Sequence, residues 1–244
     1  MFSPLEQFDV KPLIFITIGG YDLTFFDIFI PLILTIIFIG YVSMLKFYYR
    51  LIPYCSQFVL ESIVEFVYSI IKTQIGGKAY YYIPFILTIF LCVLFGNLLS
   101  IFPFGISLTS HLIILLWFSL GLGLGIFVLG LWVKGVAFLK IFVPKCPIAL
   151  LPILIIIELF SYIIRCFSLA IRLAANMLAG HTLVAIIALF ILNVILINFI
   201  FGALGFISLL AVLFLEVGVS FLQAYVITIL TCIYLNDVLG AGSH

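Results

Sequence analysis

The chain has 244 residues, of which 67% are hydrophobic and only 8% are charged, against roughly 25% charged in soluble domains. No soluble fold could bury so much apolar surface at this length, so the composition predicts an all-α protein that crosses a membrane several times. The net charge of +1 and the lack of a basic run give no reason to expect a nucleic-acid partner.

The first part of the chain predicts one membrane helix and then a helix at the membrane surface. Residues 24–45 form an apolar run of suitable length. In residues 56–75, Glu61, Glu65 and Lys72 alternate with apolar side chains at helical spacing, which is typical of an amphipathic interfacial helix. The N-terminal residues show neither a secretory signal nor the pattern of a transit peptide, so we expect no import sequence.

Four further apolar stretches follow. The first two, 82–102 and 109–133, contain no Lys, Arg, Asp or Glu and predict two membrane helices. The stretches 148–200 and 203–236 are each longer than one perpendicular crossing needs, so we expect two long, tilted helices. The sequence therefore predicts a single membrane domain over 1–244, with about five membrane-embedded helices and one interfacial helix.

No cofactor or metal site is expected. The five cysteines are scattered without the paired spacing of a zinc or redox site, and we interpret them as small apolar side chains. The sequence "IGGK" at 75–78 lacks the spacing and the final Ser or Thr of a phosphate-binding loop. Gly121 and Gly125 follow no strand, and we expect them to let two helices approach closely.

The fifth membrane helix carries an arginine within an apolar stretch. At about 100° per residue, the polar side chains around Arg172 face one way; they are Glu158, Ser161, Arg165, Ser168 and Asn176. Arg172 has no acid three or four residues away on its own helix. Because an unpaired arginine inside a membrane costs from about 2.5 to over 10 kcal/mol, it is expected to face a counter-charge or water.

The last helix supplies further polar side chains. Glu216 and Gln223 are two turns apart on one face, and His181 lies on the opposite face of the fifth helix from Arg172. Two readings are open at this point. Glu216 could form a structural ion pair with Arg172, or it could belong to a proton route with His181, a residue type that titrates near neutral pH.

Several segments together resemble one protein family over essentially the whole chain. They are "SPLEQF", "YIPFILTIFLCVLFGNLLSIFPFGISLTSH", "IELFSYIIRCFSLAIRLAANMLAGHTL" and "LEVGVSFLQAYVITIL". In this order they are similar to subunit a of F-type ATP synthases, the membrane stator that faces the rotating c-ring. The resemblance implies that the last two helices form a tilted hairpin against the c-ring and that the peripheral stalk and other membrane-sector subunits are further partners. Phosphate chemistry would take place on other subunits of that complex.

The resemblance also implies roles for individual residues. Arg172 aligns with the essential arginine that separates two half-channels, and His181 and Glu216 align with a pair assigned to the inlet half-channel. Glu158 aligns with an acid of the other half-channel, and Asn176 and Gln223 lie where the family has polar residues near the arginine. Further candidate residues on the last two helices are Arg165, Ser168 and Asp237.

The chain departs from the family pattern at a few positions. Cys166 stands where proline is usual, "NLLS" at 97–100 replaces the common "NLLG", and "PKCP" replaces a turn that usually contains glycine. A histidine at 181 with a glutamate at 216 is the mitochondrial arrangement, so we expect an organelle-encoded protein of the mitochondrial inner membrane. A bacterial plasma-membrane protein is the alternative location. A stand-alone channel or transporter and a structural subunit of a respiratory complex are the alternative functions.

Overall fold

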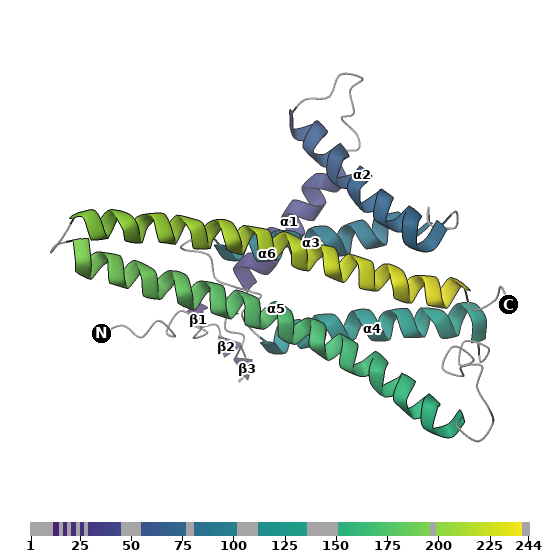
Figure 1. Ribbon diagram of the computed structural model, residues 1–244. Coiled ribbons are helices and arrows are strands. Elements are labelled where there is room, and N and C mark those ends of the chain that lie inside the picture. The colour runs from purple at the N-terminus through teal and green to yellow at the C-terminus, as the bar shows by residue number, and fades with distance from the viewer. Residues whose placement is uncertain are drawn as a thin grey trace. The chain divides into compact units, whose positions relative to one another are not determined.

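The computed structural model confirms a helical membrane protein. The residues it describes are 12–14, 17–18, 21–22, 25–26, 29–44, 55–76, 81–101, 112–135, 151–195 and 199–240. They contain six helices, which are α1 (Phe29–Met44), α2 (Cys55–Ile75), α3 (Ile83–Ile101), α4 (Leu112–Lys134), α5 (Leu151–Ile195) and α6 (Phe199–Gly240). Within this part of the chain, α3 to α6 are long and apolar enough to cross a membrane. Figure 1 shows α5 and α6 as the two long ribbons in green and yellow.

The first membrane helix is shorter than the sequence predicts. The prediction begins it at residue 24, but α1 begins at Phe29 and has 16 residues, a length of about 24 Å against about 30 Å of hydrocarbon. Pro31 explains the later start, because proline is tolerated in the first turn of a helix and would interrupt the interior of one that began at 24. A fifth crossing through α1 therefore stays a prediction.

Short strands precede α1 and were not predicted. β1 (Pro12–Ile14) pairs antiparallel with β4 (Phe25–Phe26), and β2 (Thr17–Ile18) pairs antiparallel with β3 (Tyr21–Asp22). Each two-stranded ladder is too small to be stable alone, so these strands do not change the fold class.

Helix α2 is amphipathic, as its sequence indicates. Val67 and Ile71 are fully buried, whereas Glu61, Glu65 and Lys72 are exposed. Its charged residues therefore lie away from the face that packs against protein. A position at the membrane surface remains a prediction for this helix.

The chain divides into two compact units that share its long helices. The first unit consists of Met1–Tyr49, Leu91–His111 and Leu173–Ala224, and the second of Arg50–Phe90, Leu112–Arg172 and Tyr225–His244. In the first unit, α5 and α6 pack antiparallel in a constant register. Gly180 of α5 lies against Glu216 of α6, and Ile191 of α5 lies against Gly205 of α6. From the first contact to the second, α5 advances by eleven residues and α6 goes back by eleven.

In the second unit, α4 and α5 approach closely at Gly123, not at the two glycines predicted from the sequence. A Cβ added to Gly123 would lie 2.6 Å from Cys166 Sγ, whereas one added to Gly121 or Gly125 would meet nothing within 4 Å. The hydroxyl of Tyr162 also donates a hydrogen bond to the Gly123 carbonyl over 2.6 Å. The expectation for Gly121 and Gly125 was wrong because a pattern of alternate glycines does not show which of them faces the neighbouring helix.

Candidate functional site

The first unit buries a set of polar side chains from two helices. Asn97 and Ser100 of α3 are 0% and 1% exposed, three residues apart and therefore on one face. Glu216, Ser220 and Gln223 of α6 are 4%, 0% and 1% exposed, at the spacing of a second continuous face. Burying polar groups among apolar helices is costly unless they find partners, so these two faces are candidates for a functional site.

His181 of α5 connects the two faces. Its Nε2 atom lies within hydrogen-bonding distance of the Ser100 hydroxyl, and the same nitrogen is 3.8 Å from Glu216 Oε1. The second distance is longer than a hydrogen bond, so a small movement or a bridging water is needed for a proton to pass. The structure thus brings together the two residues that the sequence assigned to one pair, and adds a third.

Gly180 makes room for the carboxyl group of Glu216. A Cβ at Gly180 would lie 2.9 Å from Glu216 Oε1 and 3.1 Å from its Cδ, both closer than ordinary contact. The carboxyl group therefore packs directly on the backbone of α5, next to His181.

Several atoms of this cluster are buried without a hydrogen-bond partner. They are both amide atoms of Asn97, both amide atoms of Gln223, and Oε1 of Glu216. In folded proteins about nine in ten buried polar groups are paired, either with protein or with ordered water. A concentration of unpaired atoms around a His–Glu contact is therefore suited to holding water in a polar path.

The second unit contains Arg172, the arginine within the apolar stretch of α5. Arg172 is exposed, and on the same helix Ile164 and Ile171 are 60% and 50% exposed. Among the described residues of this unit, Arg172 makes no ion pair. Arg165, Ser168 and Arg172 line one hollow together with Val226, Ile229 and Leu230 of α6. A permanent positive charge is thus exposed on a polar stripe of α5, flanked by exposed apolar side chains, and none of the described residues covers it.

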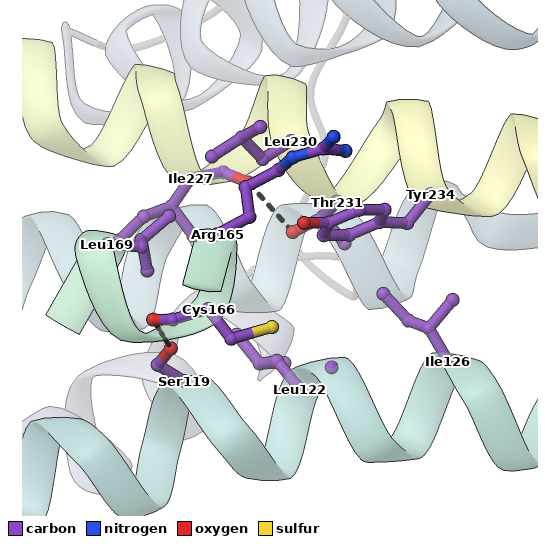
Figure 2. A pocket seen from close by; sticks show the side chains of 11 residues that line it. Ser119, Leu122, Ile126, Arg165, Cys166, Leu169, Ile227, Leu230, Thr231 and Tyr234 are labelled. Carbon is purple, nitrogen blue, oxygen red and sulfur yellow. Dashed lines mark hydrogen bonds between the residues drawn. The ribbon is translucent and has the colours of Figure 1, made fainter. Parts of the chain in front are cut away.

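Arg165 and Glu158, which are seven residues apart on one face of α5, do not form an ion pair. The guanidinium of Arg165 lies over the ring of Tyr234, 5.5 Å from the centroid, in a cation–π contact. Figure 2 shows Arg165 and Tyr234 at a pocket that Ser119, Leu122 and Ile126 of α4 line from the other side. Ser119 also donates a hydrogen bond to the carbonyl of Cys166 there.

The remaining predicted residues are dispersed. Asn176 is exposed on α5 in the first unit, and Glu158, Ser168 and Asp237 are exposed in the second. Sequence reasoning gave no role to Asn97, Ser100 or Tyr234. The signal for the first two was present, because two polar residues three apart are unexpected in an apolar helix and "NLLS" was noted as a departure.

Comparison with known proteins shows the family of this chain. A family model described as ATP synthase A chain matches residues 25–236. The chain belongs to the ATP synthase A chain family. It is therefore a multi-pass membrane protein that associates with other subunits of ATP synthase.

Relatives within the ATP synthase A chain family match over nearly their full length. A protein named ATP synthase subunit a from Chondrus crispus is 39% identical over 242 residues, covering 97% of this chain and 96% of the relative. Proteins of the same name from Brassica napus and from Wolbachia sp. (strain wRi) are 39% and 40% identical, covering 98% and 96% of this chain and 96% and 98% of the relatives. Similar proteins thus come from an alga, a plant and a bacterium.

Proposed function

We propose that this chain conducts protons through the membrane sector of an F-type ATP synthase along two offset half-channels, and that Arg172 separates them. The observation that carries the proposal is the contact between the half-buried His181 and the buried Glu216. An imidazole takes up and releases a proton near neutral pH, and a carboxyl group can hold one as a neutral acid. Placed side by side inside the first unit, these two groups form a proton relay.

The inlet half-channel runs through the polar cluster of the first unit. Protons pass between Glu216 and His181, whose facing atoms are 3.8 Å apart. The unpaired amide groups of Asn97 and Gln223 can hold the water that delivers protons to this pair. Both amides are fully buried from lipid, so the hydrated path stays within the protein.

Arg172 acts as the electrostatic separator. A guanidinium cannot be deprotonated under working conditions, so Arg172 attracts a carboxylate on a passing c-subunit without accepting its proton. Its exposed position, between exposed apolar side chains of α5, leaves it open to a partner chain. A c-subunit carboxyl group gives up its proton before it reaches Arg172 and takes up another after it leaves.

The outlet half-channel uses acids of the second unit. Glu158 and Asp237 are both exposed there, on α5 and α6 respectively. Protons released from the ring pass Glu158, while Asn176 and Ser168 offer polar contacts to the moving c-subunits. A membrane potential of 100 mV supplies about 2.3 kcal/mol for each elementary charge that crosses, and this drives rotation of the ring.

The partners follow from this mechanism. The exposed face of α5 that carries Arg172 is the surface for the c-ring, and the tilted hairpin of α5 and α6 is its support. The peripheral stalk and other membrane-sector subunits hold the chain against the torque of the ring. ATP itself is made on other subunits, so this chain requires no nucleotide site.

A double-mutant cycle tests the relay. Glu216→Gln and His181→Ala are each expected to slow proton uptake in the assembled complex, and the double variant should be about as slow as the slower single variant. The measurement is proton flux into sealed vesicles, normalised to assembled complex. Losses that multiply would mean that the two residues act separately, and the relay would be wrong.

We also propose that the chain resides in the mitochondrial inner membrane and is made inside the organelle. The support is the arrangement of His181 with Glu216 together with the high share of hydrophobic residues, 67% of the chain. A chain with so many hydrophobic spans is difficult to import. Isolated organelles, labelled while cytosolic translation is blocked, should produce a labelled protein of 27.3 kDa. Synthesis only on cytosolic ribosomes would contradict this location of the gene.

A further inference from the structure

Ser100 uses its hydroxyl in a different way from most hydroxyls on the membrane helices. Most serine and threonine hydroxyls with described bonds donate to a carbonyl three or four residues earlier in their own helix; on the spanning helices these are Thr88, Thr182, Ser208, Ser220, Thr228 and Thr231. Ser119 instead donates to a carbonyl of another helix. Among these described bonds, that of Ser100 joins the hydroxyl to a titratable side chain, His181 of α5, 81 residues away.

The bond is made at the nitrogen that also faces the acid. His181 Nε2 is bonded to Ser100 Oγ and lies 3.8 Å from Glu216 Oε1. A proton that passes between the acid and the imidazole leaves one of these atoms and joins the other, so the orientation of the ring decides whether it can move. If the ring turned, Nε2 would no longer lie close to the carboxyl group of Glu216.

A hydroxyl group suits this position because it both donates and accepts. When His181 is neutral with its proton on Nδ1, the Ser100 hydroxyl donates to the lone pair of Nε2. Nε2 has only one lone pair, so this bond has to open while a proton from Glu216 reaches the nitrogen; the new N–H at Nε2 can then donate to Ser100 Oγ. The same serine can therefore hold the ring in one orientation in both charge states, which a group that only donates could not do.

We propose that Ser100 is a positioning residue of the inlet half-channel, where it keeps Nε2 of His181 beside Glu216 before and after the imidazole gains a proton. This role rests on the proposed relay through His181 and Glu216. Ser100 is 1% exposed and Asn97, one turn earlier on α3, is fully buried with both amide atoms unpaired. Helix α3 thus supplies a third wall to the path, and Ser100 occupies a position where the family commonly has glycine.

The test compares Ser100→Ala with Ser100→Thr in the complete ATP synthase. Alanine removes the hydroxyl, and proton flux per assembled complex should fall about fivefold, the effect of losing one hydrogen bond. Threonine keeps the hydroxyl and should restore flux to within about twofold of the original protein, provided that its methyl group fits. Ser119→Ala is the matched control, because it removes another buried serine hydroxyl that bonds across helices but lies in the second unit.

A second background separates positioning from packing. In a His181→Ala complex there is no ring to hold, so Ser100→Ala should have no further effect on flux. A fivefold loss that persists without His181 would overturn the role, and so would an unchanged flux in Ser100→Ala alone. If His181→Ala itself conducts normally, the relay is wrong and this role falls with it. If His181→Ala is impaired but Ser100→Ala is not, the relay stands and only the role of Ser100 is wrong.

Discussion

Replacing Gly180 by alanine tests whether the position of the Glu216 carboxyl group controls proton uptake. The added Cβ would lie 2.9 Å from Oε1, so this oxygen has to move by about 0.5 Å to reach an ordinary contact of 3.4 Å. The same oxygen is 3.8 Å from His181 Nε2, and proton transfer needs about 2.6–3.2 Å. The displacement is comparable with the gap that has to close. Because a misplacement of about 1 Å can cost about a hundredfold in rate, we expect flux to fall about tenfold.

The variant changes no titratable group, which makes its interpretation direct. Proton flux would be measured in sealed vesicles and normalised to assembled complex. Gly40→Ala on α1 is the control in the same unit, because its methyl group meets nothing within 4 Å. Both variants gain about 1 kcal/mol of helix propensity, so a weaker helix cannot explain a loss. Unchanged flux in assembled Gly180→Ala would refute the link between carboxyl position and proton uptake.

Three further outcomes are expected. Arg172→Ala should abolish coupled ATP synthesis in assembled complexes, whereas Arg165→Ala should mainly reduce assembly through loss of its aromatic contact; normal synthesis in the first variant would rule out the separator. Gly123→Ala should lower the melting temperature of the complex, because its methyl group would lie 2.6 Å from a thiol sulfur and overpacking costs about 1–3 kcal/mol, and Gly125→Ala should not. Gln223→Leu should raise that melting temperature by removing two unpaired amide atoms while slowing proton flux, and equal flux would exclude the amide from the path.

Much of the fold follows from the sequence because membrane helices are specified by composition and length. The apolar stretches predict the helices that became α3 to α6, and helix α2 has the charged face that its pattern indicates. The ends were less predictable. Pro31 moved the start of α1, and Pro152 lies in the first turn of α5, so in both helices the apolar run begins before the helix does.

The candidate site was only partly readable for a different reason. A helical wheel places Glu216 and Gln223 on one face, and the structure buries both. It cannot tell which residue of a third helix meets them, because that depends on the register between helices. Ser100 and Asn97 were therefore missed. The role of Arg172 stays a prediction for another reason. It depends on a partner chain, and the sequence of one chain does not specify what covers its exposed face.

The bond between Ser100 and His181 also bears on how the protein is made. Ser100 leaves the ribosome 81 residues ahead of His181, so it enters the membrane before its partner on α5 has been made. A serine can bond to a carbonyl of its own helix in the meantime, but the Asn97 amide has no such ready substitute in lipid. Before α5 is made, the apolar residues of α3 allow this helix to enter the bilayer, although the polar side chain of Asn97 still lacks a hydrogen-bond partner. We therefore expect Ser100 to exchange a carbonyl of its own helix for the imidazole when α5 docks, so that the proton path is assembled in the order of synthesis.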